Sequence, residues 1–183
     1  MLAACENRWL PKESPVIGLE TSKAFPTSPQ GAGPIIRVGD RTGIFSPGLT
    51  HFLTQTAGHL ADAAKSAAPF TYQRKLMDGG TCNTTAFAAY GYDAAGLCVA
   101  LGNYHNMSIK GDIGHNDPAA ASAGPGIASE TINIQDFANL ITLLHETTTR
   151  LPTYTPGGTP IRTRLAKMHH DEQTSLLYQN PRE

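Results

Sequence analysis

The sequence has no excess of either charge and no long apolar run. In its 183 residues, 14 lysines and arginines almost balance 15 aspartates and glutamates, which leaves a formal net charge of -1. Without a basic excess to neutralise phosphates, nucleic acid is not expected to be the main partner. The longest apolar runs, such as AAGLCVAL, are far too short to cross a bilayer, and the first residues turn polar before a signal-peptide core could form. We therefore expect no membrane partner.

Cysteine is also scarce, and its spacing excludes two kinds of site. The three cysteines, Cys5, Cys82 and Cys98, form neither a paired framework nor a C-x-x-C motif. This usage is typical of reduced thiols in a cytoplasmic protein. Cys82 could act as a ligand or nucleophile, but its spacing shows no histidine partner, so a small inert residue is the favoured interpretation.

The length allows one domain with a hydrophobic core. Regular apolar periodicity continues to about residue 150 and is weak beyond it. We therefore predict a domain over residues 1–150. Residues 151–183 are expected to form a tail that packs against this domain or against a partner.

Strand and helix patterns follow one another along the predicted domain. The expected strands cover residues 14–22, 35–40, 69–76 and 94–102, and the expected helices cover residues 46–68, 83–91 and 133–151. The first long helix should bury Leu49, Phe52, Leu53, Thr56 and Leu60. The last should bury Ile134, Phe137, Leu140, Ile141 and Leu144. The order β, β, α, β, α, β, α predicts an α/β fold.

Two turns follow predicted strands, where an open α/β sheet carries its chemistry. The first holds Gly79, Gly80, Thr81, Cys82 and Asn83. Its glycines let the backbone approach a ligand, its threonine or asparagine could cap the next helix, and the helix amides could bind a carbonyl or carboxylate oxygen. The alternative is an ordinary tight turn without a ligand.

The second turn carries Tyr104 and His105 and opens a long loop over residues 106–129. Histidine is the commonest metal ligand, and a loop of this length is usually functional or disordered. His105 could therefore be a ligand or an ordinary surface histidine. His115 in the same loop is the rival candidate.

Glu20 lies near the end of the first predicted strand, where a carboxylate could bind a metal ion or simply point to solvent.

Several stretches, taken in order over roughly residues 15–150, carry a family resemblance. They are VIGLETS with Glu20, GAGPIIRVGD, a Pro-Gly-Leu at residues 47–49, Gly-Gly-Thr at residues 79–81, Tyr104-His105, Glu130 and Asp136. Together they resemble the C-terminal half of the zinc- or cobalt-dependent aminopeptidases of the tetrahedral-aminopeptidase, glutamyl-aminopeptidase and endoglucanase-like family. Cys82 stands where that family has an aspartate, and Glu130 is farther from the histidine than in the family.

This resemblance implies a mixed twisted sheet sandwiched by helices, the fold of the phosphorylase/hydrolase-like zinc exopeptidases. It also implies a site for two zinc or cobalt ions in the complete enzyme, with Glu20 and His105 as two of five ligands. Residues Gly79 to Asn83 would line the substrate cleft. The other three ligands and the general base belong to upstream motifs that this sequence does not match, so no catalytic base is assigned here. The chain is therefore expected to be either a truncated gene product or the C-terminal part of a longer enzyme, with residues 1–150 as the C-terminal part of the catalytic domain.

The expected activity is the removal of N-terminal residues from peptides, with a metal-activated water attacking a carbonyl that the second metal polarises. Two alternatives stay open: a related di-zinc deacylase or carboxypeptidase, and a non-catalytic remnant that serves as an assembly module. The family also implies a homo-oligomer, although the inserted domain that builds its assemblies is not recognisable here.

Overall fold

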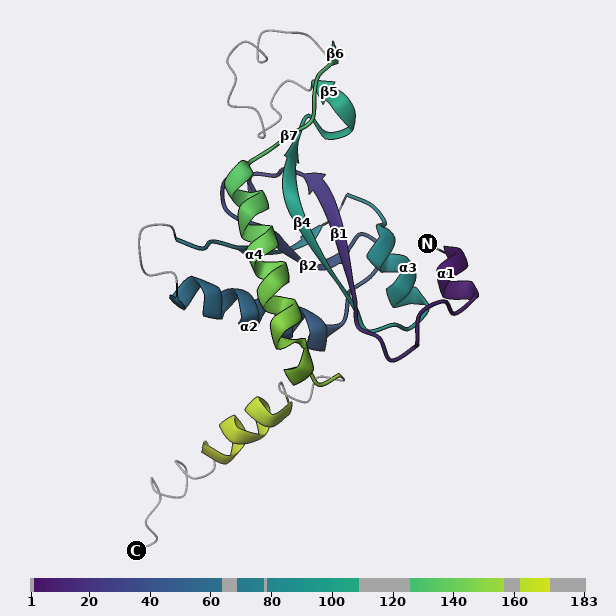
Figure 1. Cartoon of the computed structure of the whole chain (residues 1–183), viewed down its shortest axis with the longest axis vertical. Coiled ribbons are helices and arrows are strands. Elements are labelled where there is room, and N and C mark those ends of the chain that lie inside the picture. The colour runs from purple at the N-terminus through teal and green to yellow at the C-terminus, as the bar shows by residue number, and fades with distance from the viewer. Residues whose placement is uncertain (1, 64–68, 78, 109–125, 157–161, 172–183) are drawn as a thin grey trace, which may run out of the picture.

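A mixed five-stranded sheet organises the chain (Figure 1). The computed structural model describes residues 2–63, 69–77, 79–108, 126–156 and 162–171. The strands of this sheet are β1 (Val16–Lys23), β2 (Ile35–Asp40), β3 (Gln73–Met77), β4 (Ala94–Gly102) and β7 (Thr131–Ile132). Their order is β1, β4, β2, β3, with β7 paired to β4.

Strand β4 is the centre of the sheet, and every one of its nine residues is buried. Its side chains alternate between two hydrophobic clusters. Ala95, Leu97 and Val99 join the larger cluster, whereas Cys98 and Ala100 join a smaller one on the opposite face. A strand that is buried on both faces shows a continuous apolar run instead of an alternating pattern, which is why its bounds are predicted correctly from the sequence.

Helices cover both faces of the sheet. The larger cluster brings α2 (Pro47–Ala63) and α4 (Ile134–Arg150) onto one face. On the other face, α3 (Asn83–Ala89) packs on β1 and β4, and α1 (Leu2–Glu6) packs on α3. The α/β class with a mixed sheet between helices is confirmed.

The strands do not all run the same way. β1 is parallel to β4, β2 is antiparallel to β4, and β3 is parallel to β2. The carboxyl ends of β3 and β4 therefore point in opposite directions. The turn after β3 and the turn after β4 nevertheless line the same cavity. They do so because residues 79–82 run from β3 toward β1, where α3 begins.

The predicted buried face of α2 is confirmed, with Leu60 half-buried, whereas that of α4 is only partly right: Leu140 is buried and Leu144 packs against the larger cluster. Helix α4 buries Asp136, Asn139, Leu140, Leu143 and Thr147. Three residues of the predicted stripe are instead exposed: Ile134 (77%), Phe137 (43%) and Ile141 (51%).

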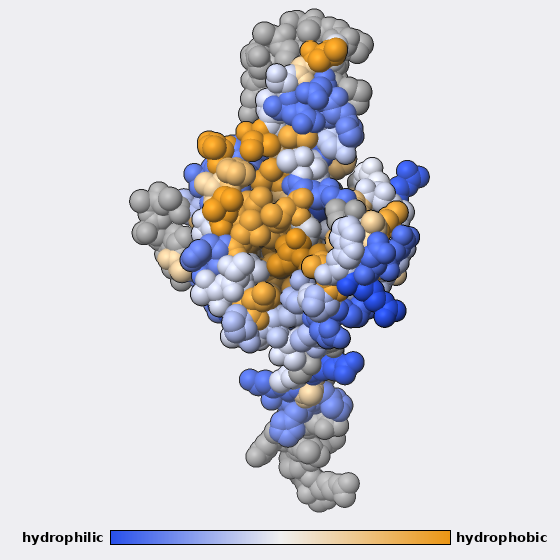
Figure 2. Space-filling model, turned by 45° about the vertical axis from the view of Figure 1, so that its right-hand side comes forward, coloured by the Kyte–Doolittle hydropathy of each residue, from blue (hydrophilic) through white to orange (hydrophobic). Residues whose placement is uncertain are grey.

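The physical reason is a buried polar contact. The Asp136 carboxylate, which is 1% exposed, accepts hydrogen bonds of 2.7 Å from the backbone amides of both Gly31 and Gly33. This contact turns α4 so that its acidic first turn faces the β1–β2 loop. Apolar side chains of α4 are thereby left on the surface, and Figure 2 shows an apolar area in the middle of the visible face.

Some elements differ from the predicted bounds. Strand β3 starts at Gln73 rather than at residue 69, and β1 extends three residues beyond Glu20. The long loop contributes η1 (Tyr104–Asn106), β5 (Met107–Ser108) and β6 (Gly126–Ile127). Residues 64–68 of the predicted helix and His115 lie outside the described residues.

The first residues of the predicted tail form η2 (Leu151–Thr153) and pack on the domain. Leu151 and Tyr154 border the larger cluster, and the Tyr154 ring lies 5.2 Å from that of Phe52. Residues 162–171 form a further, exposed helix. None of the helices that the structure describes is long and apolar enough to cross a membrane.

A matched pair of substitutions on α4 tests its orientation. Leu143→Ala removes a side chain that is 0% exposed, so it is expected to lower the free energy of unfolding by roughly 2–5 kcal/mol. Ile141→Ala, on the exposed side, is expected to cost under about 1 kcal/mol. Urea unfolding of both variants measures the difference. Equal losses would contradict this orientation of α4.

Candidate functional site

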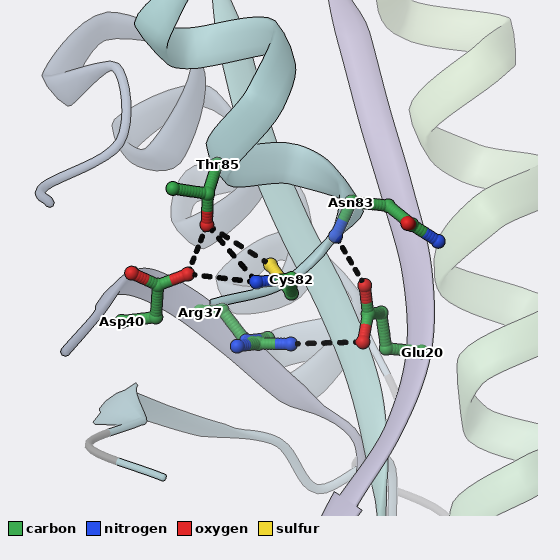
Figure 3. Close-up of polar contacts among 6 residues, drawn as sticks. All are labelled: Glu20, Arg37, Asp40, Cys82, Asn83 and Thr85. Atoms are coloured by element: carbon green, nitrogen blue, oxygen red, sulfur yellow. Dashed lines mark hydrogen bonds and ion pairs between the residues drawn. The ribbon is translucent and has the colours of Figure 1, made fainter. Parts of the chain in front are cut away.

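The turn into α3 is held from two sides by carboxylates of other strands (Figure 3). Asp40, the last residue of β2, accepts a 3.1 Å hydrogen bond from the Cys82 amide and another from the Thr85 hydroxyl. Glu20 of β1 accepts a 3.0 Å hydrogen bond from the Asn83 amide. The helix cap predicted from Thr81 or Asn83 is wrong, because Cys82 occupies the N-cap position.

The surroundings of Asp40 lower the pKa of its carboxyl group. Burial raises the pKa of this group, but hydrogen bonds from Thr85, Thr42 and the Cys82 amide outweigh burial and leave the pKa below its ordinary value of 3.8. The charged form of Asp40 therefore stabilises the folded turn.

An ion pair crosses the sheet beneath this turn. The Arg37 Nη1 atom of β2 lies 3.4 Å from the Glu20 Oε2 atom, and the two side chains are 5% and 20% exposed. Between them runs β4, where Gly96 leaves room for the arginine: a Cβ atom at Gly96 would lie 3.2 Å from the Arg37 Cβ. The absence of a side chain at Gly96 thus lets Arg37 lie across β4 toward β1.

Glycine also sets the position of α3. A Cβ atom on Gly18 of β1 would lie 2.0 Å from the Thr84 hydroxyl oxygen. Because such a contact is impossible, Gly18 is what allows α3 to pack directly on the strand that carries Glu20.

These elements enclose a small cavity of about 160 Å³. Its walls come from β1, β2, the turn before α3 and the residue that opens η1. The lining includes Glu20, Lys23, Arg37, Tyr104 and residues 79–82.

Most of the predicted substrate-binding residues meet at this cavity. Gly79, Gly80, Thr81 and Cys82 line it. Asn83 does not line the cavity. Its backbone amide instead donates a hydrogen bond to Glu20. The structure thus brings together Glu20 and the glycine turn, although Glu20 lies inside β1 and not at its end. Their roles as ligand and as substrate-binding residues stay predictions.

His105 lies beside this cavity and does not line it. Its side chain is exposed, its backbone is left-handed with φ of 61°, and its amide donates a 3.0 Å hydrogen bond to Glu130. The imidazole packs on the ring of Tyr104, with centroids 4.0 Å apart. Tyr104, rather than His105, is therefore the member of this pair that reaches the cavity.

Solved structures share this arrangement of strands and helices. A dodecamer described as PhTET1-12s aligns over 80% of this chain at 19% identity and a TM-score of 0.53. The TET1 peptidase of Pyrococcus horikoshii, described as assembling into a tetrahedron or a large octahedral shell, aligns over 79% at 17% identity and a TM-score of 0.52. A TET aminopeptidase from a marine sediment archaeon of the Thaumarchaeota aligns over 77% at 19% identity and a TM-score of 0.49.

The fold is a TET-peptidase fold. This chain spans only 36% of the length of each TET1 chain and 34% of the archaeal one. No protein-family model matches the sequence, and no curated protein does. The likeness to TET peptidases therefore concerns the fold, and an activity for this chain has to be argued from its own residues.

The two predicted metal ligands do not form a metal site on their own. Among the described residues, no three histidine, cysteine or acidic side chains gather where they could hold a metal ion. Both carboxylate oxygens of Glu20 already have partners, one of which is the Arg37 cation. A divalent cation at Glu20 would lie close to this guanidinium and be repelled by it. The described residues alone therefore do not complete a metal site.

Arg37 and Asp40 are site residues that were missed from the sequence. Both lie in IIRVGD, the short strand at residues 35–40. An arginine in the middle of an apolar strand is the available signal, because a buried charge requires a partner. Asp40 gives a weaker signal: it is the acidic last residue of the same strand.

The hydrogen bonds of Asp40 predict a dependence of stability on pH. Asp40→Asn is expected to lower the free energy of unfolding by roughly 1–3 kcal/mol at pH 7. Because the folded pKa is depressed, this contribution is present above the ordinary pKa and is lost as the pH falls through the folded value. Urea unfolding at pH 7 and pH 3 should thus show a smaller difference from the wild type at pH 3.

The control is Asp62→Asn on α2, whose side chain is exposed. It is expected to change stability by less than about 0.5 kcal/mol at either pH. A loss in Asp40→Asn that is independent of pH would show that the charge of Asp40 does not hold the turn.

Proposed function

We propose that this chain is the peptide-binding part of a peptidase with the TET fold. The main observation behind this proposal is the cavity that is lined by Glu20, Arg37, Tyr104 and the turn at residues 79–82. Two further features support the proposal. The fold is that of solved TET peptidases, and the turn presents glycine backbone, which a peptide can approach closely.

More specifically, we propose that the complete enzyme is a metal-dependent aminopeptidase. In this proposal, zinc or cobalt serves the complete enzyme, and Glu20 and His105 contribute two ligands. The remaining ligands and the general base come from residues other than those that the structure describes. Hydrolysis by the described residues alone is not expected, because Glu20 is paired with Arg37 and no third ligand among these residues joins it.

A non-catalytic binding module is the second candidate, and the Glu20–Arg37 pair favours it. In this candidate the guanidinium provides the positive charge that balances Glu20, so the fold is stable and binds peptide without a metal. Self-association is part of both candidates, supported by the assemblies that are described for TET1.

Peptide binding is tested by narrowing the cavity. Thr81 is exposed and lines the cavity, so Thr81→Trp should fill its mouth and leave the core intact. We expect short alanine peptides to bind the wild type in ligand-observed NMR and to bind Thr81→Trp at least about tenfold more weakly, a change of about 1.4 kcal/mol.

The matched control is His59→Trp, because His59 is exposed on α2 and is not part of the cavity lining. It should bind these peptides as the wild type does. Equal binding by the wild type and Thr81→Trp would place the peptide elsewhere and refute the proposed site.

Metal binding is tested by titrating the chain with zinc and cobalt in parallel with His105→Ala and Glu20→Gln. The incomplete ligand set predicts no stoichiometric binding at micromolar concentrations in any of the three proteins. Tight binding by the wild type that is lost in His105→Ala would show that the chain builds a metal site by itself. Peptide hydrolysis assays with either metal would then separate the enzyme from the binding module.

A further inference from the structure

The guanidinium of Arg37 is buried but has few partners. Its side chain is 5% exposed, and its ion pair with Glu20, at 3.4 Å, is longer than a good charge-assisted hydrogen bond. Its Nε atom is buried and has no hydrogen-bond partner among the described residues. A guanidinium has five donors in a planar fork, and the Nε donor of Arg37 is unused by the described residues.

This unused capacity borders the cavity. Arg37 is part of the lining, together with the turn at residues 79–82 and Tyr104. Leaving a charged donor buried without an acceptor costs free energy, so an acceptor in the cavity would stabilise the arginine. The acceptor has to be small, because the volume of about 160 Å³ is below that of pockets for drug-sized ligands.

The charges of the lining select the kind of acceptor. Two cations, Arg37 and the half-buried Lys23, face one anion, Glu20, and this leaves one positive charge in excess. A singly charged, planar carboxylate balances that excess and matches the fork of the guanidinium. A doubly charged phosphate would be repelled more strongly by Glu20.

We propose that this cavity binds a carboxylate group of a peptide, with Arg37 as its main partner and Lys23 as the second cation. The inference rests on the proposed function, because it names the part of the peptide that the site recognises. Glu20 competes with the ligand for Arg37, so the ion pair across β4 keeps the arginine oriented when the cavity is empty.

Three peptides distinguish the source of the carboxylate. They are acetyl-Ala-Ala-Ala with a free carboxyl terminus, the same peptide amidated, and amidated acetyl-Ala-Glu-Ala, whose only carboxylate is a side chain. Isothermal titration should show at least tenfold tighter binding of one acidic peptide than of the amidated neutral one. Protection of the half-exposed Cys82 from alkylation provides an independent readout, because this thiol lines the cavity.

Substitutions of Lys23 and Glu20 test whether the lining causes the preference for acidic over amidated peptides. Lys23→Gln should reduce the preference severalfold, whereas Lys12→Gln, an exposed lysine outside this cavity, should not. Glu20→Gln should strengthen carboxylate binding, because the competitor of the ligand loses its charge.

Arg37→Met alone would leave Glu20 without its partner and could prevent folding. The double variant Arg37→Met with Glu20→Met removes both charges, and such replacements are often tolerated. Circular dichroism and urea unfolding establish that it folds, and it should lose most of the preference for acidic over amidated peptides and keep only the part that Lys23 supplies.

Two results would overturn the inference and leave peptide binding intact: equal affinity of the wild type for acidic and amidated peptides, or a carboxylate preference that is undiminished in the folded double variant. Failure of all three peptides to bind the wild type would refute the proposed function itself, and this inference with it.

Discussion

The complete burial of β4 is the constraint on which the rest of the structure depends. This strand pairs with β1 on one side and with β2 and β7 on the other, and its two faces contact different clusters. Such a strand has no place for a polar side chain, and its small residues let other groups come close. At Gly96 that group is Arg37. The absence of a side chain at Gly96 therefore determines where the buried cation of the site lies.

The same constraint explains how the site is built. Glu20 and Asp40 lie on strands that β4 separates, yet both accept hydrogen bonds from successive amides of one turn. Both carboxylates therefore position the backbone of this turn, and Glu20 also pairs with Arg37. A carboxylate with such partners resembles a structural anchor more than an open metal ligand. This is why the geometry favours binding over hydrolysis by the described residues.

How much could be predicted from the sequence differs between α2 and α4. Both carry an apolar stripe at helical spacing, and for α2 that stripe is the buried face. For α4 a buried carboxylate decides the orientation, because Asp136 is needed by two amides of the β1–β2 loop. Apolar periodicity measures only the hydrophobic contribution. It predicts the wrong face where leaving buried backbone amides unpaired would cost more free energy than exposing a few apolar side chains.

The sequence by itself determined the α/β class, the bounds of β4, the start of α2 and the position of the glycine turn, because these follow from local patterns and from burial along one strand. Only the tertiary structure decided the strand directions, the pairing of Glu20 with Arg37 and the placement of His105 outside the cavity. Those features depend on contacts between segments far apart in the chain, such as Arg37 with Glu20, 17 residues apart, and Asn83 with Glu20, 63 residues apart. No spacing along the chain encodes them, since they arise only when the strands lie side by side.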